Sequence, residues 1–274
     1  MTKNIPVMIA VAPNGARKTE QDHPRIPLNS KELAVCAAAC LEAGACMIHL
    51  HVRDANNAHT LNADRYIEAT KAIRDAAGDE LIIQITTEAV GIYNVEQQIQ
   101  AVKDVKPEAV SLSIREFMPV GSDEKQSADF FKWLYTERVS PQYILYSQED
   151  ICHFNDLHAR GIIPDDNPEV LLVLGRYSEN QQSKPDDLSP LLKPVNTSCN
   201  WWLCAFGTTE AECMQKAITL GGHCRVGFEN NLLLPDGNLL PDNESSVSLI
   251  VDIARKAGRS PASPTEARQL MKMR

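Results

Sequence analysis

The sequence predicts an α/β fold of the (β/α)8 type, the TIM barrel, and two features of its pattern lead to that prediction. Short apolar runs alternate with longer helical segments eight times between residues 5 and 257. The apolar runs are continuous, which is typical of strands buried on both faces of a parallel sheet. Eight such units in about 260 residues fit one closed barrel. We therefore expect a single domain over residues 1–274.

The first four β-α units occupy the N-terminal half. Residues 5–12 form an apolar strand, and a polar loop over 13–29 leads to a helix that Asn29 or Ser30 caps and Gly44 ends. The next three strands, each with the helix that follows it, are predicted over 45–52 and 62–77, 81–85 and 94–104, and 109–113 and 126–138.

The last four units follow the same order. Their strands and helices are predicted over 143–146 and 148–160, 170–174 without a clear helix, 201–205 and 208–220, and 224–228 and 244–257. The segment 177–197 is polar, and we expect it to form a long loop excursion at the barrel mouth. A doubly wound sheet is the alternative fold, but Asn14-Gly15-Ala16-Arg17 lacks the G-x-G-x-x-G spacing of a dinucleotide-binding loop.

Composition narrows the class of protein. The formal net charge is -9, which disfavours nucleic acids and anionic membranes as general partners. The apolar run near the N-terminus has only about seven residues, too few for a signal sequence or a membrane span, so we expect a cytoplasmic protein. None of the eight cysteines forms a C-x-x-C pair, and we expect them to be reduced and buried.

Two histidines on one predicted strand indicate a metal site. Side chains alternate along a strand, so His49 and His51 share one face. In a closed barrel the eighth strand returns to the first two, and Glu229 is the carboxylate that follows it. We predict that these three residues bind a divalent metal and leave one position open for substrate. The ligand types suit Zn²⁺ and Fe²⁺, and the fold favours Zn²⁺.

Polar residues at the other predicted strand ends are candidates for substrate binding, because barrel active sites lie at the carboxyl end of the strands. Arg17 and Arg225 carry fixed positive charges that suit a substrate carboxylate. Thr86 and Ser111 add hydroxyl donors. Three further histidines near predicted loops are expected to be solvated or to support the site: His23, His59 and His223.

The chain resembles the β-keto acid cleavage enzyme family over nearly its whole length. The resemblance lies in Ala12-Pro13-Asn14-Gly15-Ala16, Ala43-Gly44-Ala45, His49-Leu50-His51-Val52-Arg53 and the run GGHCRVGFENN at 221–231. It implies a zinc-dependent TIM barrel and homotetramer that condenses a β-keto acid with acetyl-CoA. The products would be acetoacetate and a new acyl-CoA, formed by retro-Claisen cleavage. The family's metal ligands fall on His49, His51 and Glu229, and its active-site arginine on Arg225.

The chain departs from the family's amine-handling member at positions that bear on substrate and base. That member has an aspartate in place of Asn230, a glutamate in place of Arg17 and an acidic residue in place of Ile144. We keep Asn230 as a substrate-binding candidate and expect Glu88 or Asp54 to supply the catalytic base. The loss of negative charge predicts a neutral or anionic β-keto acid as substrate.

Two other functions are compatible with the same residues. A metal-dependent barrel hydrolase also uses a His-x-His pair, but places it on the first strand and adds ligands from later strands. A non-catalytic metal-binding or ligand-binding barrel gains support from Asn230, whose amide cannot accept a proton at neutral pH. Turnover of acetyl-CoA with a set of β-keto acids would distinguish the three functions.

Overall fold

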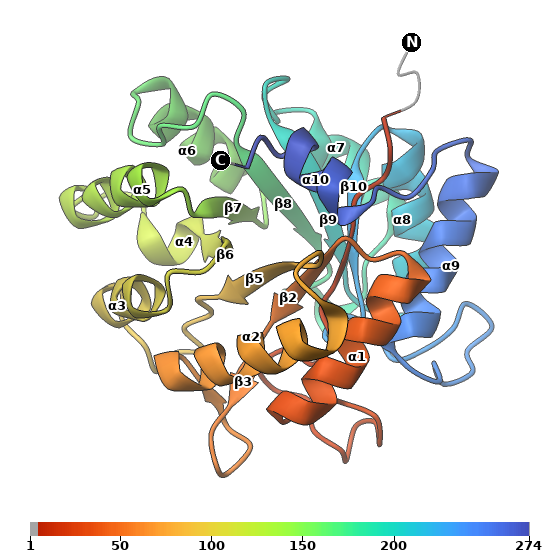
Figure 1. Ribbon diagram of the computed structural model, residues 1–274. Helices are drawn as coiled ribbons and strands as arrows, with labels where there is room; N and C mark the ends of the chain where they lie inside the picture. Colours follow the sequence, from red (N-terminus) through yellow and green to blue (C-terminus); the bar gives the residue numbers. More distant parts are fainter. Residues whose placement is uncertain (1–4, 274) are drawn as a thin grey trace.

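The computed structural model describes residues 5–273 and shows a closed barrel of eight parallel strands (Figure 1). Around the barrel the strands follow the order β1-β10-β9-β8-β7-β6-β5-β2. The predicted TIM barrel is therefore confirmed. The barrel strands are β1 (Ile9–Val11), β2 (Met47–Leu50), β5 (Ile82–Thr86), β6 (Ala109–Ser113), β7 (Ser140–Leu145), β8 (Glu169–Leu174), β9 (Asn200–Ala205) and β10 (His223–Val226).

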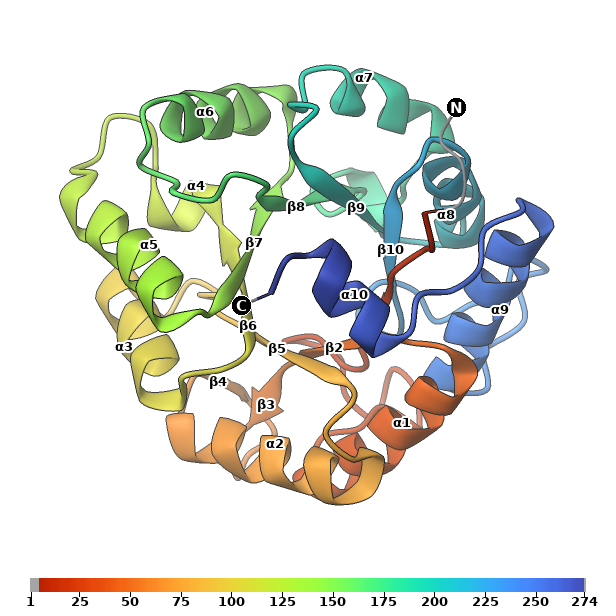
Figure 2. The ribbon, with the colours of Figure 1, turned by 45° about the horizontal axis from the view of Figure 1, so that its top comes forward.

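Helices surround the barrel on its outer side (Figure 2). They are α1 (Ser30–Ala43), α2 (Ala63–Ala77), α3 (Val95–Val105), α5 (Lys125–Glu137), α6 (Gln148–Ala159), α7 (Leu188–Leu192), α8 (Glu210–Thr219) and α9 (Asn243–Lys256). The predicted ends of the first helix are confirmed. The Asn29 side chain accepts hydrogen bonds from two backbone N–H groups of α1, and Gly44 ends the helix at a φ of 111°.

Several short elements were not predicted. After β2 the chain forms an antiparallel hairpin from β3 (Val52–Arg53) and β4 (His59–Thr60). The short helix α4 (Ile114–Phe117) follows β6 directly. The expected loop at 177–197 contains two 3-10 turns, η1 (Glu179–Gln181) and η2 (Pro185–Asp187), and the helix α7.

The C-terminal helix α10 (Pro264–Leu270) lies across the amino-terminal opening of the barrel, in the middle of the view in Figure 2. Ala267 of this helix packs in one buried cluster with Met8 and Met47, which are at the amino-terminal ends of the first two strands. Arg268 donates to the Glu108 carboxylate and to the backbone carbonyl of Glu80. The helix therefore closes this end of the barrel, and the opposite end is left for a site.

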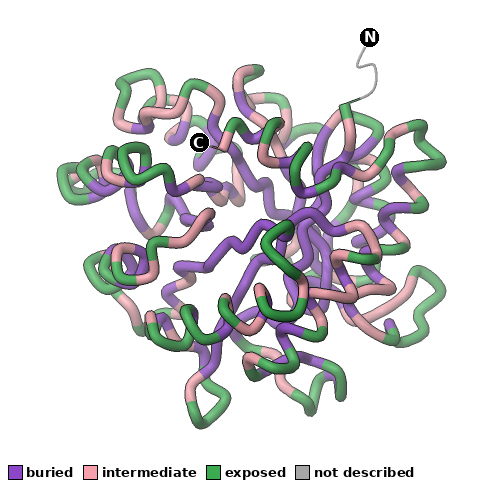
Figure 3. Tube along the Cα trace, in the orientation of Figure 1, coloured by how far each residue is buried: buried purple, intermediate pink, exposed green. Residues whose placement is uncertain are grey.

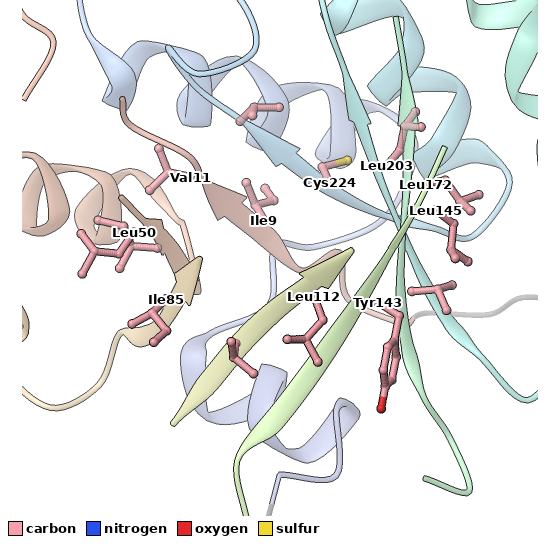
Figure 4. Close-up of a cluster of buried hydrophobic side chains, with 14 of the residues drawn as sticks. Ile9, Val11, Leu50, Ile85, Leu112, Tyr143, Leu145, Leu172, Leu203 and Cys224 are labelled. Carbon is pink, nitrogen blue, oxygen red and sulfur yellow. The ribbon is translucent and has the colours of Figure 1, made fainter. Parts of the chain in front are cut away.

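Successive side chains along each strand point to opposite faces, so the core has one part between the strands and the helices and another part inside the barrel. Apolar side chains on the outer face of the strands pack beneath the helices, and the strands are buried along their length (Figure 3). Figure 4 shows part of this layer, with labelled side chains from all eight barrel strands: Ile9, Val11, Leu50, Ile85, Leu112, Tyr143, Leu145, Leu172, Leu203 and Cys224. The alternate residues face the barrel interior.

Six of the eight cysteines are buried, as expected, but Cys36 is only partly buried and Cys152 is exposed on α6. Among residues 5–273, no helix combines the length and apolar character needed to cross a membrane.

Candidate active site

The interior of the barrel carries a polar layer at the level where TIM barrels commonly hold branched apolar side chains. Strand register places these polar residues in neighbouring pairs around the barrel. The pairs are His49 and Gln84, Ser111 and Gln142, and Cys204 and Arg225. All six are buried. Buried polar groups are costly unless they are hydrogen-bonded or serve a ligand, so this layer indicates a functional site.

His49, His51 and Glu229 converge with a geometry that suits a divalent cation. The His49 and His51 Nε2 atoms are 3.2 Å apart, and Glu229 Oε2 lies 3.4 Å from His51 Nε2 and 3.7 Å from His49 Nε2. Ligands at zinc bond lengths in a tetrahedral site are separated by about 3.4 Å. The three observed separations are close to that value.

The ring nitrogens of His49 are in the correct state for a ligand. Its Nδ1 lies 2.8 Å from Gln84 Oε1, while Gln84 Nε2 donates to Gln142 Oε1 at 3.3 Å. The amide is thereby oriented so that Nδ1–H donates to it, and Nε2 keeps its lone pair. Burial, followed by the positive charge of Arg225, lowers the pKa of His49 to about 3. The imidazole is therefore neutral at pH 7.

Glu229 contributes a full negative charge. Burial alone would raise the pKa of this carboxyl, but Arg225 and His51 hold it well below the usual range. Arg225 Nη2 lies 3.3 Å from Glu229 Oε1. Glu229 Oε2 is buried without a hydrogen-bond donor among the described residues, and it faces the two imidazole nitrogens. An unsatisfied carboxylate oxygen beside two imidazole nitrogens fits a divalent cation.

Two glycines allow the backbone to approach Glu229 closely. Gly15 has a φ of 63°, and a Cβ atom there would lie 2.6 Å from Glu229 Cγ. Gly227 has a φ of 127°, and its Cβ would lie 2.6 Å from the Ala12 carbonyl oxygen. A larger residue would strain the backbone at either position, and at Gly15 it would also displace the Glu229 side chain, so both positions require glycine.

Arg53 and Asn14 hold the loop between β1 and α1 against the hairpin. The buried Arg53 guanidinium donates to the carbonyl oxygens of Gly15, Ala16 and Lys18. Asn14 Nδ2 donates to the carbonyl oxygens of Pro27 and His51. These contacts fix the position of the loop that carries Arg17.

Two cavities lie at the carboxyl end of the strands. The inner cavity, of about 30 Å³, is lined by His49, His51, Thr86, Glu88, Ile144, Tyr146, Val173, Arg176, Phe206, Arg225 and Glu229. The outer cavity, of about 220 Å³, is lined by residues 14–18, Asp22, Glu88, Arg176, Gln181, Phe206 and Glu229. Four residues line both: Glu88, Arg176, Phe206 and Glu229. The inner cavity holds the candidate metal ligands, and the outer cavity leads away from them.

Glu88 connects two arginines at the boundary between the cavities. Its Oε1 lies 2.8 Å from Arg17 Nη1 and 3.2 Å from Arg176 Nη2. Burial raises the pKa of Glu88, but His51 and the hydrogen bond from Arg17 outweigh this and lower it below the usual value. Glu88 is therefore ionised at pH 7.

The structure does not bring all predicted site residues into these two cavities. Asp54 lies in the turn of the hairpin, where its Oδ1 accepts from the backbone N–H groups of Asn56 and Ala58. Ser111 is buried in the interior layer and lines neither cavity. Asn230 also lines neither. It is held behind Arg225, where its Nδ2 donates to the Arg225 carbonyl and its Oδ1 accepts from Cys204 Sγ.

One site residue was missed by sequence reasoning, and the place of another was left open between solvent and the support of the site. Arg176 follows β8 after a single glycine, so the rule that barrel sites occupy strand ends would have found it. His59 was expected to be solvated or supporting, and it is buried with its ring centroid 5.2 Å from that of His51. Its Nε2 lies 2.9 Å from the Glu88 carbonyl oxygen. The hairpin that brings it there was not predicted.

Comparison with known proteins places the chain in a family. Residues 6–273 match the family model of the beta-keto acid cleavage enzymes. The chain belongs to this family. Within it, the chain is 30% identical to the 3-keto-5-aminohexanoate cleavage enzyme of Acetoanaerobium sticklandii, over 97% of each protein. It is 25% identical to the 3-oxoadipate:acetyl-CoA acetyltransferase of Cupriavidus necator, over 97% of this chain and 94% of that enzyme.

A solved structure shares the fold of this member of the beta-keto acid cleavage enzymes. ObcA, in a ternary complex with a C4-CoA adduct and oxalate, matches with a TM-score of 0.75 at 15% sequence identity. The match covers 91% of this chain and 68% of that chain. At this level of identity the likeness establishes the barrel architecture.

Proposed function

We propose that this chain condenses a β-keto acid with acetyl-CoA and releases acetoacetate and a new acyl-CoA, with Zn²⁺ held by His49, His51 and Glu229. The observation that supports this most is the convergence of two imidazoles and an ionised carboxylate beside the buried Arg225. Relatives that are named for the cleavage of a β-keto acid and for transfer from acetyl-CoA point the same way.

The proposed reaction balances without a redox cofactor. A base removes a proton from the carbon between the ketone and the carboxylate of the β-keto acid. The resulting carbanion forms a bond to the thioester carbon of acetyl-CoA and expels the CoA thiolate. The thiolate then adds to the original ketone carbon, and the bond between that carbon and the deprotonated carbon breaks. The carbanion released by this cleavage takes back the proton held by the base and leaves as acetoacetate, and the other fragment leaves as acyl-CoA.

Arg225 and the metal ligands act at the carboxylate end of the substrate. Zn²⁺ bound there would withdraw electron density from the ketone and carboxylate oxygens and acidify the carbon between them. Arg225 is buried, and the contacts of its Nη2 with Cys204 Sγ at 3.2 Å and Glu229 Oε1 at 3.3 Å hold its guanidinium in place. A fixed cation in a dry site stabilises the charge on the substrate carboxylate.

Glu88 is the residue we assign as the base. It lines the inner cavity with the metal ligands, and Asp54 and Asn230 do not. Its lowered pKa keeps it ionised and able to accept a proton. The Glu88 backbone N–H donates to Thr86 Oγ1 at 3.0 Å, so Thr86 also positions the base.

An assay of both products tests the proposed function. The zinc-loaded protein is incubated with acetyl-CoA and a series of β-keto acids, and acetoacetate and acyl-CoA are quantified. We expect the two products in equal amounts. Release of free CoA with the β-keto acid unchanged would show a thioester hydrolase instead.

A further inference from the structure

We propose that Arg176 selects a β-keto acid whose tail ends in a second carboxylate. This inference rests on the proposed function and goes beyond it by defining the substrate class and the residue that recognises it. Three features of Arg176 support it: its position, the charge around it, and the contacts that hold its guanidinium.

Arg176 stands where the tail of a bound β-keto acid would reach. The inner cavity is lined by the metal ligands and by the apolar side chains of Ile144 and Val173, and Arg176 lines both this cavity and the outer one. A substrate anchored at the metal would pass its methylene groups along these apolar side chains and place its far end near the guanidinium.

The group formed by Arg17, Arg176 and Glu88 carries a positive charge. Arg17 and Arg176 share one oxygen of a single carboxylate, Glu88 Oε1, so the three groups carry a net charge of about +1. Among the described residues, Glu88 is the one carboxylate within ion-pair distance of Arg176. The guanidinium has five N–H donors, and those that Glu88 does not engage are available to a substrate carboxylate.

Arg176 is better placed than Arg17 to provide specificity. The Arg176 side chain is 17% exposed, whereas that of Arg17 is 56% exposed. Solvent and salt screen the more exposed charge. The Arg176 guanidinium also lies over the Phe206 ring, 5.4 Å from its centroid, which limits its movement. A fixed and partly dehydrated cation discriminates between substrate charges more strongly than a mobile one.

An ammonium group at the same place would meet a cation of like charge. Repulsion between like charges in a poorly solvated site opposes binding, so amine-bearing β-keto acids should be poor substrates. The phosphates of CoA are a second source of negative charge. They lie at the opposite end of the pantetheine arm from the thioester, and the experiment separates the two sources.

The experiment compares 3-oxohexanedioate with 6-methyl-3-oxoheptanoate, in which a neutral isopropyl group replaces the distal carboxylate. We expect the wild-type enzyme to prefer the dianion in kcat/KM. Arg176→Gln should lower kcat/KM for the dianion by roughly 30- to 1,000-fold and lower it far less for the substrate with the neutral isopropyl tail. Arg176→Lys should recover part of the preference. Arg17→Gln, a change to the other arginine on Glu88, should reduce the preference by only a few fold.

Three outcomes would overturn the inference. The first is a wild-type preference for the substrate with the isopropyl tail or for an amine-bearing one. The second is an equal loss of kcat/KM on both substrates in Arg176→Gln. The third is a rise in KM for acetyl-CoA that accounts for the whole loss of kcat/KM, which would assign Arg176 to CoA. Thermal shifts of the zinc-loaded protein by the two keto acids give a readout without turnover. The dianion should raise the Tm of the wild type more, and Arg176→Gln should abolish the difference. Failure of catalysis with this difference intact would count against the proposed function alone.

Discussion

Gln84 and His49 form a contact that determines which histidine nitrogen faces the candidate metal. Their Oε1 and Nδ1 atoms are 2.8 Å apart, and Gln142 orients the amide. Gln84→Met removes the acceptor at similar volume, so we expect metal affinity to fall by roughly 10- to 100-fold. Titration against a chromophoric chelator measures it. Ser111→Ala, in the same buried layer, is the control and should bind like the wild type. Equal affinities in all three proteins would contradict the role of Gln84.

The three candidate metal ligands predict how many metal ions each chain binds. We expect one divalent ion per chain, bound as Zn²⁺, and almost none in a His49→Ala, His51→Ala double variant, because a single carboxylate cannot hold the ion. Elemental analysis after dialysis measures the content. His223→Asn changes a buried histidine outside the cavities and should retain full occupancy. Full occupancy in the double variant would refute the assignment.

Arg225 and Arg17 differ in how far their charges are removed from water. The Arg225 side chain is 5% exposed and contacts Glu229, whereas that of Arg17 is 56% exposed. We expect Arg225→Ala to reduce kcat/KM by roughly 30- to 1,000-fold, or about 2–4 kcal/mol, and Arg17→Ala to reduce it much less. Steady-state kinetics with the same substrate compares them. Similar, mild losses would mean that Arg225 has only a structural role.

His223 makes the stability of the protein depend on pH. Burial, followed by the charge of Arg259, lowers its pKa to about 3, and its neutral Nδ1 accepts from the Met8 N–H at 3.0 Å. The unfolded chain binds a proton at this residue below pH 6.5 or so, and the folded chain does not. Stability from this residue is therefore present above that pH and is lost as the pH falls toward 3.

The variant His223→Asn tests this dependence. Asn Oδ1 can replace Nδ1 as the acceptor for Met8 and does not titrate. We expect the free energy of unfolding of the variant to fall less steeply between pH 6 and 4, by up to about 1.4 kcal/mol per pH unit. Urea denaturation at pH 6.5, 5.5 and 4.5 gives the slopes. Parallel pH dependences in the two proteins would show that His223 does not contribute.

Strand periodicity was sufficient to predict the barrel and the common face of His49 and His51, because alternation is a local property of extended backbone. Closure of the barrel then placed Glu229 near them, since the loop after β10 meets the loop after β1. The predicted cluster of the three residues is found in the structure.

Positions set by loops could not be predicted in the same way. Asp54 was a candidate base because it follows a strand, but the sequence Asp54-Ala55-Asn56-Asn57 forms a hairpin turn, and Asn57 adopts a φ of 59° that suits asparagine. Arg176 begins a long polar segment whose path depends on packing against distant strands. Its meeting with Glu88 joins residues 88 positions apart, which no local pattern specifies.

The fate of the acetyl group tests the central claim most directly. Acetyl-CoA labelled with ¹³C in both acetyl carbons is incubated with zinc-loaded enzyme and an unlabelled β-keto acid, and the products are read by NMR. We expect acetoacetate labelled at its ketone and methyl carbons, together with an unlabelled new acyl-CoA in equal amount. Labelled free acetate with no labelled acetoacetate would contradict it.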